Sequence, residues 1–315
     1  MRAFATDGFG HPGTIREVPA PEPGEGEILI RVKAAGLNAT DLLALAGWLK
    51  DYMPHEWPLI PGIDGSGVVE RLGPGVAGFE IGDEVFGFRN AGTSVGRGTL
   101  AELVTIPAPG VLPKPASLEH HEAATLPHSL LTATAAFDAA KVSSGDRVVV
   151  LGATGGVGSY GTQMLARAGA EVIAITIGEH AAYARSMGAS TTIDYHATDA
   201  PTEVRRLYPD GIEAVLDLAS FPDLAARLAE LVREGGHVVS LMVPPDVDAL
   251  AARGVEGSLT SRWATESRFA ELAGQVASGD LKLPEIQKFQ FAESAAAMEL
   301  LATRHVRGKL AVLMP

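Results

Sequence analysis

The residues with the clearest chemical meaning form a glycine-rich segment after an apolar run. The run Arg147–Leu151 (RVVVL) leads into GATGGVG, and helical spacing follows from Tyr160 to Ala168. Glycine permits a tight turn and close approach to a pyrophosphate, whose charge is stabilised by the amino terminus of the helix. An ordinary strand-to-helix turn can look similar, but further strand and helix units follow this one. The sequence predicts a dinucleotide site at Gly152, Thr154, Gly155, Gly156 and Val157.

The end of the next apolar run bears on the choice between NADPH and NADH. Enzymes that use NADH commonly place Asp or Glu there, where it accepts a hydrogen bond from the ribose 2′-hydroxyl. This run ends in Thr-Ile-Gly (176–178), and the missing carboxylate favours the 2′-phosphate of NADPH. Glu179 keeps NADH open as the less favoured coenzyme. Tyr183 could equally be a core contact, and Arg185 a solvated helix residue. The candidate phosphate neighbours are Thr176, His180, Tyr183 and Arg185.

The absence of cysteine limits the chemistry further. The sequence has 0 Cys, which removes disulfides, thiolate nucleophiles and zinc sites built on sulfur. It also has no HExxH motif and no Tyr followed four positions later by Lys. His120 and His121 are adjacent and cannot both face one metal from a helix, so we expect them at the surface and predict no metal site. A hydride donor without a Lewis acid suits quinones and conjugated enones, because addition at the β carbon gives a delocalised enolate.

Composition excludes several classes of protein. The formal net charge of -13 disfavours nucleic-acid binding, which depends on Lys and Arg. The chain is 46% apolar, yet no stretch approaches the roughly 20 uninterrupted apolar residues of a membrane span. Its first ten residues do not have the pattern of a signal peptide. We therefore expect a cytoplasmic globular protein that binds neither nucleic acid nor membrane.

A change in pattern divides the 315 residues into two predicted domains. Residues 1–119 contain short apolar runs between Gly and Pro, which is typical of an antiparallel β domain. Residues 120–264 alternate apolar runs with helical segments, the pattern of βαβ units around a parallel sheet. Residues 265–315 hold two helical segments and two short strand-like runs. We expect these last strands to return to the first domain.

Several motifs occur together and span nearly the whole chain. They are AAGLNATDLLALAG (34–47), PLIPGIDGSGVVERLGPGV (58–76), FEIGDEVFGF (79–88), GTLAELVTIP (98–107), LPHSLLTATAAF (126–137), the glycine-rich turn and HVRGKLAVL (305–313). In this order they resemble the medium-chain dehydrogenase/reductase superfamily and, within it, the zinc-independent quinone oxidoreductases of the zeta-crystallin type. The resemblance implies an α/β fold, with a doubly wound Rossmann domain and a GroES-like β domain. Zinc-containing relatives have Cys where this chain has Asn38, and a His–Glu pair where it has Ile63–Asp64.

Four residues are candidates for the catalytic site. The resemblance places Asn38 and Asp41 near the nicotinamide, although either could instead cap the helix that follows. Many such quinone reductases have a Tyr over the substrate where this chain has Leu43, so Tyr52 could take that place. His128 is a candidate proton donor or, alternatively, a helix-end residue.

The resemblance also implies coenzyme contacts outside the glycine-rich turn. Thr132 would reach the nicotinamide carboxamide, and Lys309 looks like the family's terminal cleft residue. Coenzyme and substrate are both expected in a cleft between the domains. The residues expected to border the adenosine or the nicotinamide ribose are Gly178, Tyr195, Ser220, Leu241 and Val243.

The sequence thus predicts a zinc-independent oxidoreductase that transfers hydride from NADPH to a small hydrophobic quinone or α,β-unsaturated carbonyl. An enoyl thioester reductase of a biosynthetic pathway and a non-catalytic NADPH-binding protein remain alternatives. The run Val255–Trp263 resembles an outer strand of the sheet, and the family commonly pairs such edges. A homodimer is therefore expected.

Overall fold

The computed structural model describes residues 1–51, 53–89, 95–260 and 267–315. The chain forms two compact units, Met1–His128 with Glu285–Pro315, and Ser129–Pro284. Both boundaries differ from the predicted ones at residues 119 and 264. The first moves because α2 (His120–Ala123) packs against strands of the first unit. The second moves because Gln163 bonds both the backbone N–H and the carbonyl of Lys282, which ties the segment after residue 265 to the second unit.

The first unit is a β structure that contains, among its described residues, three complete α-helices. Its strands are β1 (Arg2–Ala5), β2 (Thr14–Glu17), β3 (Glu27–Leu37), β4 (His55–Ile60), β5 (Asp64–Leu72), β6 (Glu84–Phe88), β7 (Val95–Arg97), β8 (Leu103–Pro107), β9 (Val111–Pro113), β16 (Ile286–Gln290) and β17 (Lys309–Leu313). Its helices are α1 (Ala39–Leu45), α2 and α10 (Ser294–Ala302). The main sheet runs β16-β17-β3-β5-β6-β9, and β8 also pairs with β3.

The long strand β3 organises this sheet. It pairs antiparallel with β5 along one edge and with β8 and β17 along the other. Leu310 lies opposite Leu37, so the carboxyl-terminal strand meets the segment that leads into α1. The aliphatic residues Ile28, Ile30 and Val32 of β3 pack in the core of this unit. The removal of their apolar surface from water stabilises the fold. The topology therefore brings residues 38 and 309 together.

Among the described residues, the second unit has a six-stranded parallel sheet in the order β12-β11-β10-β13-β14-β15. The strands are β10 (Arg147–Leu151), β11 (Glu171–Thr176), β12 (Thr191–Asp194), β13 (Ile212–Asp217), β14 (Val232–Ser240) and β15 (Glu256–Leu259). The α-helices are α3 (Pro127–Ala140), whose first two residues belong to the first unit, α4 (Gly156–Arg167), α5 (Ala181–Ser186), α6 (Ala200–Leu207), α7 (Pro222–Ala229), α8 (Val247–Ala251) and α9 (Phe269–Ala277).

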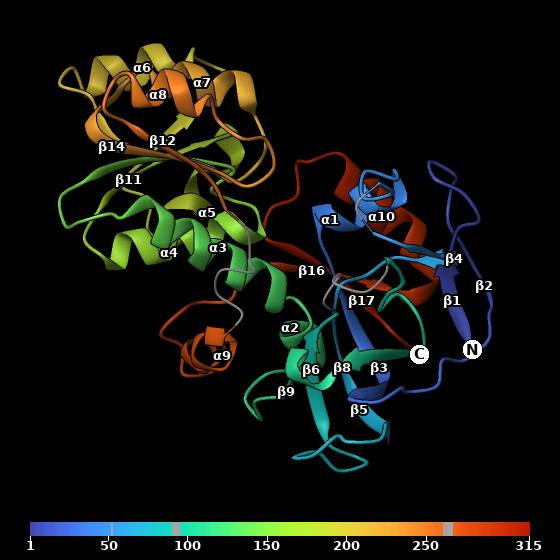
Figure 1. Cartoon of the computed structure of the whole chain (residues 1–315). Coiled ribbons are helices and arrows are strands. Elements are labelled where there is room, and N and C mark those ends of the chain that lie inside the picture. Colours follow the sequence, from blue (N-terminus) through green and yellow to red (C-terminus); the bar gives the residue numbers. More distant parts are fainter. Residues whose placement is uncertain (52, 90–94, 261–266) are drawn as a thin grey trace. The chain divides into compact units, whose positions relative to one another are not determined.

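Helices cover both faces of this sheet. Figure 1 shows α6, α7 and α8 on one side of the strands and α3, α4 and α5 on the other. Val149 and Leu151 pack in one core, while Val148 and Val150, which point the other way, pack in a second core. A parallel sheet buried on both faces explains the nearly continuous apolar runs of the sequence. The predicted doubly wound α/β fold is confirmed. None of the described helices has the length and apolarity that crossing a membrane requires.

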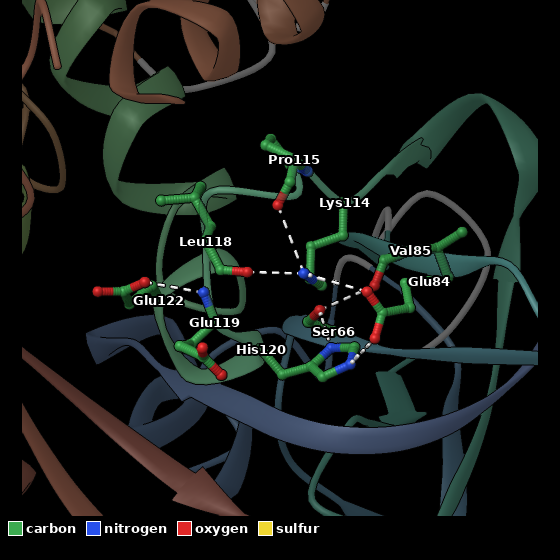
Figure 2. Close-up of polar contacts among 9 residues, drawn as sticks. All are labelled: Ser66, Glu84, Val85, Lys114, Pro115, Leu118, Glu119, His120 and Glu122. Carbon is green, nitrogen blue, oxygen red and sulfur yellow. Dashed lines mark hydrogen bonds and ion pairs between the residues drawn. The ribbon is translucent and has the colours of Figure 1, made fainter. Parts of the chain in front are cut away.

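His120 is only partly exposed, whereas the sequence predicted a surface residue. Because α2 packs over β3 and β5, the His120 ring turns onto the sheet, where its Nδ1 lies 2.8 Å from Ser66 Oγ and its Nε2 lies 3.3 Å from a Glu84 oxygen. Figure 2 shows this group, in which the Ser66 hydroxyl also donates to the Val85 carbonyl and Lys114 pairs with Glu84. Burial lowers the pKa of His120, and Glu84 opposes that change.

Candidate active and coenzyme-binding sites

Four polar side chains lie buried together in the first unit, and we call them the buried polar group. Asn38 precedes α1, Asp41 lies in its first turn, and the other two are Asp64 at the start of β5 and Lys309 at the start of β17. Each is at most 4% exposed. Since burial of charged groups is costly unless they are paired, the contacts among these residues decide whether the group is stable.

Hydrogen bonds connect three members in a chain. The Lys309 ammonium donates to the Leu37 carbonyl at 2.6 Å and to Asn38 Oδ1 at 2.5 Å. Asn38 Nδ2 in turn donates to Asp64 Oδ2 at 3.0 Å. The Asn38 amide therefore links an ammonium to a carboxylate, and both ends of its side chain are engaged.

Asp41 is held by backbone donors. Its Oδ2 accepts from the Asn38 N–H at 2.8 Å and its Oδ1 from the Gly62 N–H at 3.1 Å. Burial is the main cause that raises the pKa of Asp41 to about 7, and Asp64 adds to it, while the Asn38 N–H, Lys309 and the Gly62 N–H oppose it. Burial likewise lowers the pKa of Lys309 against the attraction of both carboxylates. Asp41 thus combines the capping contact anticipated as an alternative with the ability to hold or release a proton near neutral pH.

Asp41 should make the stability of the fold depend on pH. Its pKa is raised from 3.8 to about 7 by folding, so between these values the folded state holds a proton that the unfolded state has lost. The stabilising contribution is therefore complete below the unfolded pKa and lost as the pH rises through the folded pKa. We expect that contribution to the free energy of unfolding to fall by about 2–4 kcal/mol between pH 4 and pH 8.

Urea unfolding at several pH values measures this dependence. Asp41→Asn should flatten the profile relative to the wild type, whatever its absolute stability, because the titrating group is gone. The exposed Glu25→Gln is the matched control and should keep the slope of the wild type. Identical slopes for Asp41→Asn and the wild type would refute the assignment.

His128 adjoins the buried polar group. It lies in the first turn of α3, where its backbone N–H donates to Asp64 Oδ2 at 3.1 Å. Its ring Nε2 lies 3.3 Å from the Thr40 hydroxyl. The structure therefore gathers Asn38, Asp41, His128 and Lys309, whereas the candidate Tyr52 lies outside the described residues. The catalytic role of each stays a prediction.

The second unit carries the glycine-rich turn between β10 and α4. A Cβ on Gly158 would lie 2.0 Å from the Gly152 carbonyl oxygen, so this position must be glycine for the helix to pack on the strand. A Cβ on Gly155 would have only that same oxygen near it, at 3.6 Å. Gly155 therefore has open space beside it in the folded chain, which is what a pyrophosphate needs in order to approach the backbone.

The features around this turn fit a nicotinamide dinucleotide. Helix α4 begins at Gly156, so Gly155 caps it and Gly156 and Val157 are its first two residues. The first N–H groups of a helix have no partner within the helix and can donate hydrogen bonds to an anion. Thr132 Oγ1, on α3, is buried and has no hydrogen-bond partner among the described residues. A buried hydroxyl without a partner is unfavourable unless a ligand completes it, and a carboxamide would do so.

Predicted coenzyme residues also follow the other strands of the sheet. Thr176 ends β11, and its hydroxyl lies 3.3 Å from that of Thr154. Because carboxyl ends of parallel strands share one edge, these positions lie along the side of the sheet where nucleotides bind. The others at this edge are Gly178 after β11, Tyr195 after β12, Ser220 after β13, and Leu241 and Val243 after β14.

Two predicted phosphate neighbours have other contacts. The Tyr183 hydroxyl lies 2.9 Å from Ser159 Oγ of α4, and the side chain is 7% exposed, so it is the core contact considered as an alternative. Arg185 is exposed and donates to the Thr192 hydroxyl at 2.6 Å. Their roles toward a coenzyme stay predictions.

Two buried carboxylates were missed from the sequence. Asp64 joins Asn38 to His128, and Asp217 accepts from the N–H groups of Ala219 and Phe221, which shapes the loop that contains Ser220. The sequence did contain a signal for each of them. Asp217 ends an apolar run in the segment LDLAS, and Asp64 is the single acidic residue in the segment PLIPGIDG. Among the described residues, no three His, Asp or Glu side chains gather in a way that could hold a metal ion.

Comparisons with known proteins agree with this architecture. Residues 24–116 match the family model described as alcohol dehydrogenase GroES-like domain, and residues 187–312 match zinc-binding dehydrogenase. The chain is 36% identical over 242 residues to synaptic vesicle membrane protein VAT-1 homolog-like of Mus musculus, which is 76% of this chain and 56% of that protein. The chain thus spans about half the length of this relative.

Two further proteins are similar over nearly the whole chain. The NADPH-dependent alkenal/one oxidoreductase, chloroplastic, of Arabidopsis thaliana is 30% identical over 322 residues, which cover 99% of this chain and 79% of that protein. The solved structure of the quinone oxidoreductase from Coxiella burnetii has a TM-score of 0.86 and 30% identity, covering 100% of this chain and 99% of that one. The predicted family is thereby confirmed: this chain belongs to the medium-chain dehydrogenase/reductase superfamily, in its quinone oxidoreductase (zeta-crystallin-like) family.

Proposed function

We propose that this chain is an oxidoreductase that uses NADPH to reduce a small hydrophobic quinone or α,β-unsaturated carbonyl. The observation that carries the proposal is the turn around Gly155, which has open space beside it, at the amino terminus of α4. The Arabidopsis relative is named for NADPH and for alkenal and enone substrates, and the Coxiella structure for quinones, which supports the choice of coenzyme and acceptor.

The coenzyme, when bound, supplies a hydride. This chain's residues would bind and orient it: the turn 152–158 would receive the pyrophosphate, and Thr132 the carboxamide. Thr176 ends β11 and Gly178 lies two residues further on, so neither of these positions offers a carboxylate to the ribose 2′-hydroxyl. This favours NADPH.

The buried polar group would serve the acceptor. Asn38 is fixed by Lys309 and Asp64, so its position is defined before any substrate arrives. Asp41 can hold a proton near neutral pH. Hydrogen bonds would stabilise the enolate oxygen, and protonation would come from water or a nearby side chain. No single residue need act as an essential acid.

We also propose that the reaction is independent of zinc. Zinc-containing relatives have a Cys where the first unit has the amide of Asn38, and the His of a His–Glu pair where it has the apolar Ile63. An ammonium, that of Lys309, already bonds to the Asn38 oxygen. A cation at that oxygen makes the donor set a poor fit for a second cation, so we expect no loss of activity on treatment with a chelator.

Asn38→Ala should lower turnover while NADPH still binds. The substitution removes the acceptor of the Lys309 ammonium and the donor to Asp64, but leaves the residues around Gly155 unchanged. Steady-state kinetics combined with an NADPH titration separates the two effects. Asn38→Asp keeps an acceptor for Lys309 but sets a carboxylate against that of Asp64, so it should also lower turnover. Wild-type kinetics for Asn38→Ala would overturn its proposed role.

The test of the function is an acceptor panel with purified protein and either NADPH or NADH. We expect oxidation of NADPH with a quinone or a simple enone, and slower oxidation of NADH. Turnover of an enoyl thioester alone would favour the biosynthetic enoyl reductase. Tight binding of NADPH, together with no reduction of any acceptor in the panel, would favour the non-catalytic alternative.

Self-association and location are further proposals. Strand β15 lies at the edge of its sheet, and the edge of a sheet can pair with a strand of a second copy. The last residues of the predicted strand, 261–263, lie outside the described residues. Sedimentation that shows a concentration-independent monomer would contradict a homodimer. The cytoplasmic location and the absence of nucleic-acid and membrane partners stay predictions.

A further inference from the structure

Strand β12 brings a carboxylate to the place where the sequence appeared to have none. Asp194 is its last residue and lies opposite Thr176, the last residue of β11. The two strands are parallel, so both residues lie at the edge that carries the glycine-rich turn. An acid at the end of β11 was the expected mark of an NADH enzyme, and the neighbouring strand provides one instead.

The Asp194 carboxylate is close to the backbone of Gly178. One oxygen would lie 2.6 Å from a Cβ built on Gly178, and the other accepts from the His196 N–H at 2.9 Å. Gly178 begins a short 3-10 helix, Gly178–His180, which is separated from the end of β11 by Ile177 alone. Among the salt bridges of the described residues, none involves Asp194. Its negative charge is therefore not neutralised by an ion pair.

We propose that Asp194 sets the coenzyme preference by weakening the binding of NADPH relative to NADH. The inference rests on the proposed function. A carboxylate at this edge can accept a hydrogen bond from a ribose 2′-hydroxyl, as the acid of an NADH enzyme does. It repels a 2′-phosphate, whose charge at neutral pH is between one and two negative units.

A cation of α5 that contacts the same strand acts in the opposite direction. Arg185 donates to Thr192, which lies two residues before Asp194 and on the same face of β12. Its guanidinium attracts a 2′-phosphate while Asp194 repels one. The site therefore contains one group of each sign, and removal of the negative one should strengthen the preference for NADPH.

The test compares coenzyme affinities of the wild type and Asp194→Asn. Asparagine keeps an oxygen that can accept from the His196 N–H, so the loop can retain its shape. Dissociation constants for NADPH and NADH, and for the fragments 2′,5′-ADP and 5′-AMP, are measured by calorimetry. We expect the preference for the phosphorylated member of each pair to rise by about tenfold in Asp194→Asn, which corresponds to about 1.4 kcal/mol.

Asp210→Asn is the matched control, because it removes one negative charge from an exposed loop that precedes β13, at the opposite edge of the sheet. An unchanged NADPH to NADH ratio in Asp194→Asn, or an equal rise in Asp210→Asn, overturns the assignment of Asp194. Failure of the wild type to bind either coenzyme would instead overturn the proposed function, so the two failures are distinguishable.

Discussion

Lys309→Met should lower the free energy of unfolding by about 3–5 kcal/mol, since removal of one partner leaves buried charge without compensation. Lys309 is 4% exposed, and its ammonium is the cation of a group that contains the carboxylates of Asp41 and Asp64. Without it, the Leu37 carbonyl and Asn38 Oδ1 also lose their donor. Urea unfolding at pH 7 measures the change.

Two further variants make this result interpretable. Lys288→Met removes an exposed lysine from β16 of the same unit and should change stability by less than about 0.5 kcal/mol. Adding Asp64→Asn to Lys309→Met should restore part of the loss, because the buried negative charge is then removed as well. A loss below about 1 kcal/mol in Lys309→Met would show that the ammonium does not stabilise the group.

Gly155→Ala should leave the fold intact and weaken NADPH binding by at least about 30-fold, because a methyl group would occupy the space that a pyrophosphate needs. The new Cβ would have its nearest neighbour at 3.6 Å, an ordinary contact, and the φ of Gly155 is -77°, which alanine adopts without strain. Thermal unfolding without ligand and an NADPH titration together test this expectation.

Gly158→Ala provides the contrast. Its Cβ would lie 2.0 Å from the Gly152 oxygen and 2.7 Å from Ala153 Cα, so the strand and helix would have to separate. This variant should lose stability even without ligand. If Gly155→Ala binds NADPH as tightly as the wild type, then the turn is only a packing feature and does not receive the coenzyme.

The second unit was the more predictable part of the fold from sequence. Its central strands β10, β11 and β13 are mostly apolar and buried, and the turn after β10 joins a strand to a helix within a few residues, so local patterns determine both. The predicted coenzyme positions Thr176 and Ser220 follow strand ends for the same reason. Arg185 and Tyr183 were less predictable, because helical spacing does not determine which face of α5 meets α4.

The buried polar group could be predicted only in part. Asn38 and Asp41 stand beside a predicted helix, but the bond between Asn38 and Lys309 joins residues 271 positions apart and depends on the pairing of β17 with β3. The place of Asp194 likewise depends on the register of β12 against β11. Such contacts arise from tertiary pairing, and no local pattern records them.

The most direct test of the proposed function follows the hydride itself. NADPH that carries deuterium at either face of nicotinamide C4 is incubated with the protein and a simple enone, and the product is examined by nuclear magnetic resonance. We expect deuterium at the β carbon of the saturated product from one of the two labelled forms. Tight binding of NADPH without deuterium in any product from the enone or a quinone would contradict the proposal that this chain transfers hydride to such acceptors.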